Sequence, residues 1–229
     1  MLMVRAKRLI GFMTKSLLKT HWPILLDRAM RIIETLPEDT SWTWGGGTAL
    51  SIRIDHRLSY DIDIFLSNVD IMLLHPSNNK VVKEITKNIQ FPGYCVKLLF
   101  EEGEIDFLTG STITTPGSTR EAISDHDVPL ETTSEIIAKK LHFRGSRALA
   151  RDVFDLEAAR RFAYDDFVSG VKAEPDGARR VSDLIRRKVN RYQKELPLSV
   201  NPTDKGTAVL DMDLLDLAGI LEEIARGSS

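Results

Sequence analysis

Two aspartates separated by one residue give the strongest chemical signal in this sequence. Asp61 and Asp63 flank Ile62 in the run YDIDIF, and side chains two residues apart on a β-strand point to the same face. Two like charges so close repel each other, which raises the pKa of one carboxyl group unless a cation lies between them. The pair therefore predicts a cation site.

A third carboxylate lies in a similar setting downstream. Asp106 interrupts the apolar run EIDFL, and aspartate is poorly suited to the interior of a strand. Three carboxylates, with no cysteine nearby and no pair of histidines at ligand spacing, suit a hard cation such as Mg²⁺ or Mn²⁺. The alternative is that each aspartate is a strand-end or turn residue.

A glycine pair precedes the aspartates. Gly46-Gly47-Thr48 lies between a predicted strand over 42–44 and a predicted short helix over 48–54. Glycine allows tight backbone geometry and close approach, and free N–H groups at the start of a helix attract phosphate. Gly-Gly-Thr alone is weak evidence for a phosphate site. Its spacing from the aspartate pair makes the combination a more specific signal.

The elements that must position these residues follow from periodicity and turn signals. A strand over 60–66, a hairpin over 94–100 and 104–108, and a short strand over 112–115 are predicted, with mostly helical structure over 69–90. Helices are predicted over 3–20, 23–36, 134–144, 148–163, 165–195 (one or two) and 209–225. The fold class is therefore α+β, with N-terminal helices (1–38), a small mixed-sheet core (39–118) and a helical C-terminal region (119–229).

Composition bounds the class of protein. The 229 residues suffice for one substantial core with a smaller appended domain. A net charge of −2 gives no global basic field. The single cysteine, Cys95, excludes an intramolecular disulfide and is expected in the core. No apolar run approaches the ~20 residues of a membrane span, so we expect a cytoplasmic protein without a membrane partner.

These motifs resemble those of a known superfamily and, more closely, those of one family within it. The glycine pair, the Asp61/Asp63 pair and Asp106 resemble the carboxylate signature of the DNA polymerase beta–like nucleotidyltransferase superfamily. More closely, GGTAL…HRLSYDIDIF and EIIAKKLHFRG…ARDVFDL resemble the AbiEii/AbiGii nucleotidyltransferase-like toxins of type IV toxin–antitoxin and abortive-infection systems. The resemblance covers roughly residues 40–160.

The resemblance implies a two-metal transfer of a nucleoside monophosphate from an NTP. Asp61, Asp63 and Asp106 would be metal ligands, and Asp106 would also be the base candidate. Gly46, Gly47 and Thr48 would hold the phosphates of the nucleotide. The resemblance also implies an RNA acceptor, with tRNA as a candidate, and a cognate antitoxin as a partner.

The second motif carries a lysine pair. Lys139 and Lys140 lie ~100° apart on a helix, so we expect one of them to face the cleft and to bind triphosphate as a point charge. Lys140 is the candidate for the catalytic site and Lys139 for nucleotide binding. A pair of solvated lysines is the alternative.

Arg151, Asp152 and Asp155 follow on the next predicted helix. Asp152 is a catalytic candidate that could orient the lysine, and Arg151 and Asp155 are nucleotide-binding candidates. Alternatively, Arg151 and Asp155 form a helix-surface ion pair worth about 0.3–0.5 kcal/mol. Arg57, in His56-Arg57, could reach a phosphate or form a structural ion pair.

A basic stretch, 179–194, could contact RNA phosphates. Its alternative is a solvated amphipathic face, with Val181, Ile185 and Tyr192 turned away from Arg180, Arg187, Arg191 and Lys194. The acidic tail, 211–223, could neutralise it or bind a partner. Two other functions stay open: a catalytically silent nucleotide-binding module, and nucleotidylation of a protein or small-molecule hydroxyl.

Overall fold

The computed structural model describes residues 20–93 and 95–228. These residues form two compact units. Unit 1 holds 20–48, 58–111 and 122–127, and unit 2 holds 49–57, 112–121 and 128–228. The predicted helix over 3–20 lies outside the described residues except for its last position.

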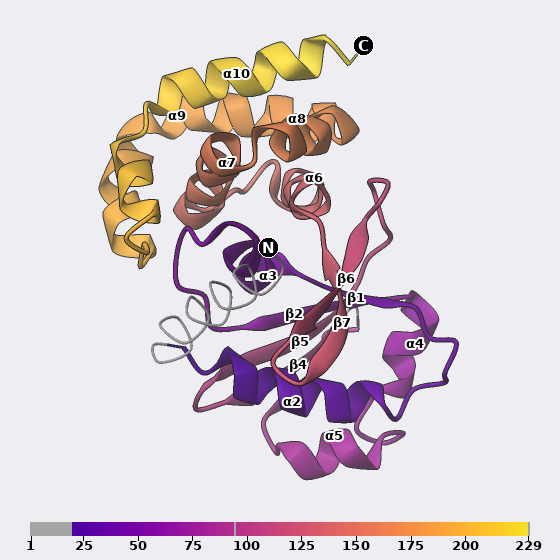
Figure 1. The fold of residues 1–229 in the computed structure, drawn as a ribbon. Coiled ribbons are helices and arrows are strands. Elements are labelled where there is room, and N and C mark those ends of the chain that lie inside the picture. The colour runs from indigo at the N-terminus through magenta and orange to yellow at the C-terminus, as the bar shows by residue number, and fades with distance from the viewer. Residues whose placement is uncertain (1–19, 94, 229) are drawn as a thin grey trace, which may run out of the picture. The chain divides into compact units, whose positions relative to one another are not determined.

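Helices and strands are mixed in the chain up to Glu131, and the described elements after it are all helices (Figure 1). In chain order they are α2 (Trp22–Ile33), β1 (Trp42–Gly45), α3 (Gly46–Ile54), β2 (Ile62–Leu66), α4 (Asn68–Leu73), α5 (Lys80–Ile85), β3 (Ile89–Gln90), β4 (Cys95–Phe100), β5 (Gly103–Thr109), β6 (Ser118–Ile123), β7 (His126–Glu131), α6 (Thr133–Arg144), α7 (Ala150–Phe162), α8 (Tyr164–Ala173), α9 (Pro175–Ser199), the 3-10 helix η1 (Gly206–Asp211) and α10 (Leu214–Arg226).

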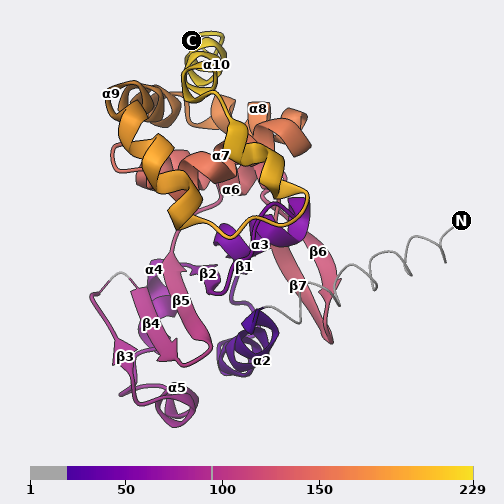
Figure 2. The same cartoon turned by 90° about the vertical axis from the view of Figure 1, so that its left-hand side faces the viewer.

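The strands form one mixed sheet in the order β3-β4-β5-β2-β1-β7-β6. β2 and β5 are parallel, whereas β1 pairs with β2, and β4 with both β3 and β5, in antiparallel fashion. Figure 2 shows β4 and β5 side by side. The predicted α+β class with a mixed-sheet core and a helical C-terminal half is therefore confirmed.

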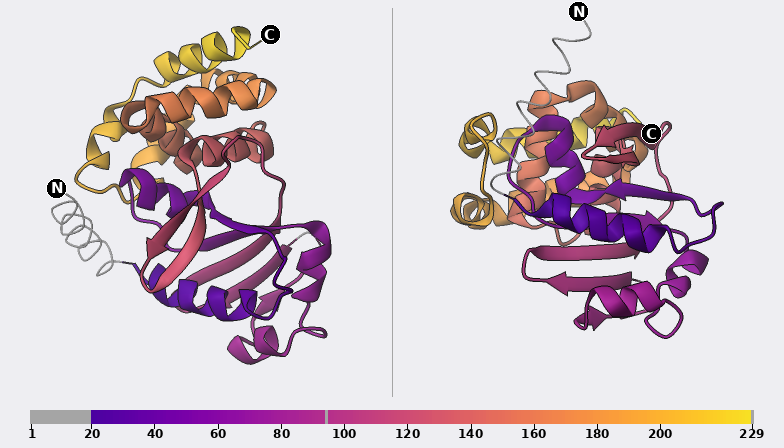
Figure 3. Two further views of the ribbon diagram at one scale, coloured as in Figure 1. Left: turned by 45° about the vertical axis from the view of Figure 1, so that its right-hand side comes forward. Right: turned by 60° about the horizontal axis from the view of Figure 1, so that its bottom comes forward.

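One face of the unit 1 sheet carries the hydrophobic core. Alternate residues of β2 and β5, such as Ile62, Ile64 and Phe107, are fully buried, as period-2 alternation requires. Helix α2, which begins at Trp22 with Pro23 in its first turn, lies along this face (Figure 3). The Trp22 and Trp44 rings pack with centroids 5.6 Å apart. The opposite face is thereby left for the polar residues of the same strands.

Unit 2 is held together by long helices. α9 runs over 25 residues, with non-helical dihedral angles at Lys188. The Ser182 hydroxyl donates to the Ala218 carbonyl over 2.8 Å, which ties α9 to α10. Val181, Ile185 and Tyr192 are buried, so the predicted apolar face of this stretch is confirmed.

One predicted strand is wrong. Residues 112–115 form no strand; instead, the Glu135 carboxylate accepts hydrogen bonds from the backbone N–H groups of Ile113 and Thr114 at 2.7–3.1 Å. A side chain thus satisfies the donors that a neighbouring strand would otherwise take. The sequence reasoning also missed the β6 and β7 strands. In the described part of the chain, no helix is both long and apolar enough to cross a membrane.

Candidate active site

Four residues lie side by side across the sheet of unit 1, and we call them the carboxylate row. Gly45 of β1 is the register partner of Asp63, Asp63 of Asp106 on the parallel strand β5, and Asp106 of Lys97 on β4. Because alternate residues share a face, this row lies on the side opposite the buried Ile62 and Ile64. The strand pairing therefore brings two of the three predicted carboxylates together, and adds a lysine that the sequence reasoning had not singled out.

Gly46 leaves room for the Asp63 carboxylate. Its φ of +73° is unfavourable for residues with a side chain, and a Cβ built there would lie 1.9 Å from Asp63 Oδ2. The glycine at the start of α3 is thus required by its backbone conformation and by the aspartate beside it. Gly47 is half-buried in the first turn of α3.

Thr48 fixes the chain next to Asp61. Its buried hydroxyl donates to the Asp61 carbonyl over 2.5 Å and lies 2.9 Å from Ser59 Oγ. Asp61 ends the segment just before β2, and its carboxylate accepts a hydrogen bond from the backbone N–H of Glu104 over 3.1 Å. The Thr48 hydroxyl therefore holds the aspartate segment in place.

Asp106 is paired with a lysine on the neighbouring strand β4. Its Oδ2 accepts a hydrogen bond from Lys97 Nζ over 2.8 Å, whereas its buried Oδ1 has no hydrogen-bond partner among the described residues. Burial raises the pKa of the Asp106 carboxyl group, although Lys97 opposes the shift. Burial disfavours the Lys97 charge, but its hydrogen bonds to Asp106 and Glu104 raise the pKa of the ammonium overall.

The donor chemistry of this region fits a divalent cation. Carboxylate oxygens are the ligands that Mg²⁺ and Mn²⁺ prefer, and the unpartnered Oδ1 of Asp106 is such a donor. Within residues 20–93 and 95–228, however, no three His, Cys, Asp or Glu side chains are grouped closely enough to hold a metal ion. Cation binding would therefore require these side chains to draw together.

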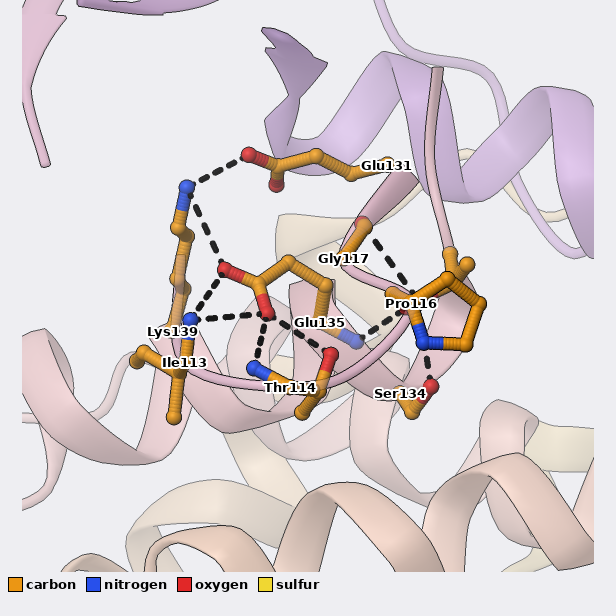
Figure 4. A network of polar contacts seen from close by, with 9 residues as sticks. Ile113, Thr114, Pro116, Gly117, Glu131, Ser134, Glu135 and Lys139 are labelled. Atoms are coloured by element: carbon orange, nitrogen blue, oxygen red, sulfur yellow. Dashed lines mark hydrogen bonds and ion pairs between the residues drawn. The ribbon is translucent and has the colours of Figure 1, made fainter. Parts of the chain in front are cut away.

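In unit 2, Lys139 belongs to a buried network (Figure 4). Its Nζ lies 2.5 Å from the Glu131 carboxylate and 3.5 Å from that of Glu135. Glu135 in turn binds Ile113 and Thr114. Only 5% of the Lys139 side chain is exposed, so its described contacts anchor the segment before β6 to α6.

Lys140 belongs to a different network. Its Nζ lies 2.9 Å from Asp152 Oδ1 and 2.8 Å from Asp155 Oδ2, and 13% of its side chain is exposed. Asp152 also accepts a hydrogen bond from the backbone N–H of Leu149 over 3.0 Å, which caps the start of α7. An ammonium has three N–H donors, and two described carboxylates account for two of them.

Asp155 is the centre of this second network. The carboxylate is fully buried and accepts hydrogen bonds from Arg57 Nε over 2.6 Å and Nη2 over 3.0 Å, and from His56 Nε2 over 2.8 Å. Burial alone would raise the pKa of Asp155, but the charges of Arg57 and Lys140 hold it well below its usual range. Burial lowers the pKa of His56, which is therefore neutral at pH 7.

Arg57 thus forms the structural ion pair that the sequence left open. Arg151 is exposed on α7, and the described contacts of Asp155 run to Arg57, His56 and Lys140. Among the described residues, Arg151 and Asp155 therefore do not form the surface ion pair that was the alternative.

The sequence reasoning missed Lys97, Glu131 and Glu135. A signal for Lys97 was present: it is the one charged residue in the β-strand run CVKLLF, and a hairpin with Asp106 brings the two opposite each other. Pairing of Lys139 with Glu131 and Glu135 depends on the path of residues 112–131, which local periodicity does not encode.

Comparison with known proteins relates this chain to a protein family and to solved structures. The family model described as "Nucleotidyl transferase AbiEii toxin, Type IV TA system" matches residues 28–216, a range that contains both the carboxylate row and the Lys140 network. The "Crystal structure of putative nucleotidyltransferase from H. pylori" is similar at 21% identity, covering 89% of this chain and 93% of that chain, with a TM-score of 0.45. No curated protein matches the chain.

Proposed function

Because this chain belongs to the AbiEii family of nucleotidyl transferase toxins, we propose that it transfers a nucleoside monophosphate from an NTP to an RNA acceptor. The acceptor would be tRNA, the reaction would use Mg²⁺ or Mn²⁺, and a cognate antitoxin would counter the toxicity. The observation that carries the proposal is the register of Asp63 with Asp106 on the polar face of the sheet, beside Gly46.

The reaction follows from the residues on that face. An acceptor hydroxyl oxygen attacks the α-phosphorus of the NTP, the bond from that phosphorus to the bridging β-oxygen breaks, and pyrophosphate leaves. Asp106 accepts the hydroxyl proton. Divalent ions held by Asp61, Asp63 and Asp106 would stabilise the attacking and leaving oxygens.

Two further groups would bind the substrates. The third N–H donor of Lys140, which the described carboxylates of Asp152 and Asp155 leave unused, suits a phosphate oxygen. For the acceptor, α9 exposes Arg180, Arg187, Lys188 and Lys194, for which the described residues provide no ion-pair partner. Arg191 is paired with Glu195, and Arg186 with Glu222 of the acidic tail. The remaining cations would contact RNA phosphates, in which case binding weakens steeply with salt.

The test is transfer of label from α-labelled NTPs to total RNA in the presence of Mg²⁺ or Mn²⁺. Wild type should label an RNA band, Asp63→Asn should not, and Asp39→Asn, which removes a charge from an exposed loop of the same unit, should behave as wild type. Label that survives RNase treatment would instead indicate a protein or small-molecule acceptor. Nucleotide binding without labelling of any fraction would indicate a silent module.

A further inference from the structure

Lys97 places a positive charge at the end of the carboxylate row. Its Nζ lies 2.8 Å from Asp106 Oδ2 and also contacts the Glu104 carboxylate. Lys97 and Asp106 are direct register partners on antiparallel strands, so the pairing is fixed by the sheet rather than by the reach of a long side chain. About a quarter of the Lys97 side chain is exposed.

The ammonium and a divalent cation would compete for the same carboxylate. Asp106 is bound to Lys97 through Oδ2, and its Oδ1 has no hydrogen-bond partner among the described residues. A divalent ion at Oδ1 would therefore lie within a few ångströms of a fixed positive charge. The ammonium of Lys97 and the double positive charge of the ion repel each other at that separation in a partly buried site. The free energy of this repulsion exceeds what the hydrogen bond from Lys97 gains by orienting the Asp106 carboxylate.

We propose that Lys97 is a positioning residue whose ammonium binds Asp106 in the free protein. Its charge makes binding of the divalent cation to the carboxylates depend on the nucleotide. This inference rests on the proposed function. The triphosphate brings several negative charges, which offset the Lys97 charge, so the cation and the nucleotide bind together. In the absence of nucleotide, cation binding is weak.

The experiment measures Mn²⁺ binding to purified protein by electron paramagnetic resonance of the free ion, with and without an α,β-methylene NTP analogue. Lys97→Met should bind Mn²⁺ at least about tenfold more tightly than wild type without the analogue, and the gain in affinity on adding the analogue should shrink. Lys97→Arg keeps the charge and should resemble wild type. Lys80→Met removes an exposed lysine of the same unit and should also resemble wild type.

Unchanged or weaker Mn²⁺ binding by Lys97→Met would overturn the inference. Lys97→Gln carries the test if the methionine variant does not fold, as judged by circular dichroism. Failure of the proposed function gives a separate result: Mn²⁺ binding that is the same in wild type and Asp63→Asn would place the ion elsewhere, whatever Lys97 does.

Discussion

Asp63 and Asp106 face each other on neighbouring parallel strands, one on β2 and one on β5. Like charges directly opposite each other destabilise a sheet, and aspartate is unfavourable within strands. Packing gives no reason for the pair, since the core lies on the other face. The fold therefore tolerates a local repulsion, which the ammonium of Lys97, 2.8 Å from Asp106 Oδ2, offsets.

Replacing Asp63 should separate activity from stability. Asp63→Asn removes one of the two facing charges, so the free energy of unfolding should stay the same or rise by up to about 1 kcal/mol. Nucleotidyl transfer should fall by about 10²- to 10³-fold or more, as when a group that stabilises transition-state charge is lost. RNA labelling and urea unfolding measure the two effects. Loss of activity together with a large loss of stability would contradict the assignment.

Gly46 and Gly93 offer a matched pair of substitutions. Both have positive φ, but a Cβ at Gly46 would meet Asp63 Oδ2 at 1.9 Å, whereas nothing lies within 4 Å of one at Gly93. Gly93→Ala should cost about 1–2 kcal/mol of stability through backbone strain alone, with transfer unchanged. Gly46→Ala should cost more and also abolish transfer, because it displaces the Asp63 carboxylate. Equal stability losses in urea unfolding would show that the contact with Asp63 is unimportant.

The sequence predicted most of the elements, because their signals are local. The apolar alternation around Asp63, the turn before Gly103 and the cap and periodicity of 134–144 are each readable within about ten residues. Lys97 and the buried Glu131 and Glu135 escaped notice because their roles depend on partners brought by the register of strands or the path of a loop. The predicted strand over 112–115 was wrong for the same reason.

The residues of the Asp155 network illustrate a second limit. On a helix, Arg151 and Asp155 are spaced for a surface pair, and nothing local shows that Asp155 is buried. Its partners Arg57 and His56 lie about a hundred residues earlier in the chain. The sequence could offer Asp155 as a site candidate, but only the tertiary structure shows that it holds Lys140 and Arg57.

Removing the Asp155 charge should be strongly destabilising. Asp155→Ala leaves the Arg57 and Lys140 charges without their buried counter-ion, which typically costs about 3–5 kcal/mol. Arg151→Ala, an exposed change four residues away on the same helix, should alter the free energy of unfolding by no more than about 0.5 kcal/mol. Urea unfolding of both variants measures the difference, and similar small effects would contradict the burial of Asp155.

Stability should depend on pH through His56. Burial lowers the pKa of His56 below 6.5 in the folded protein, so below pH 6.5 the unfolded chain binds a proton that the folded protein does not. The contribution of His56 to the free energy of unfolding is therefore fully present above pH 6.5. It is lost as the pH falls below 6.5, by up to about 1.4 kcal/mol per pH unit. The lowered pKa of Asp155 acts in the same direction, but only below about pH 4.

The matched variant is His56→Gln, whose amide can still donate to Asp155. Urea unfolding between pH 7.5 and pH 5 should show that wild type loses more stability than the variant, by up to about 1.4 kcal/mol per pH unit below pH 6.5. Carboxyl groups that titrate near pH 4 to 5 are common to both proteins and cancel in the comparison. Parallel pH profiles for the two proteins would contradict this prediction, because they would mean that His56 has the same pKa in the folded protein and in the unfolded chain.

The two adjacent lysines should separate into one structural and one substrate-binding residue. Lys139→Met leaves the Glu131 and Glu135 charges buried without their cation, so it should destabilise unit 2 by about 3–5 kcal/mol with little change in the KM for NTP. In Lys140→Met, Asp155 keeps Arg57 as a partner, so the loss of stability should be smaller. The loss of a charge-assisted bond to phosphate, about 1.5–3 kcal/mol, should raise the KM about 10- to 100-fold. Steady-state kinetics and urea unfolding of both variants test the assignment, and a KM effect confined to Lys139→Met would reverse it.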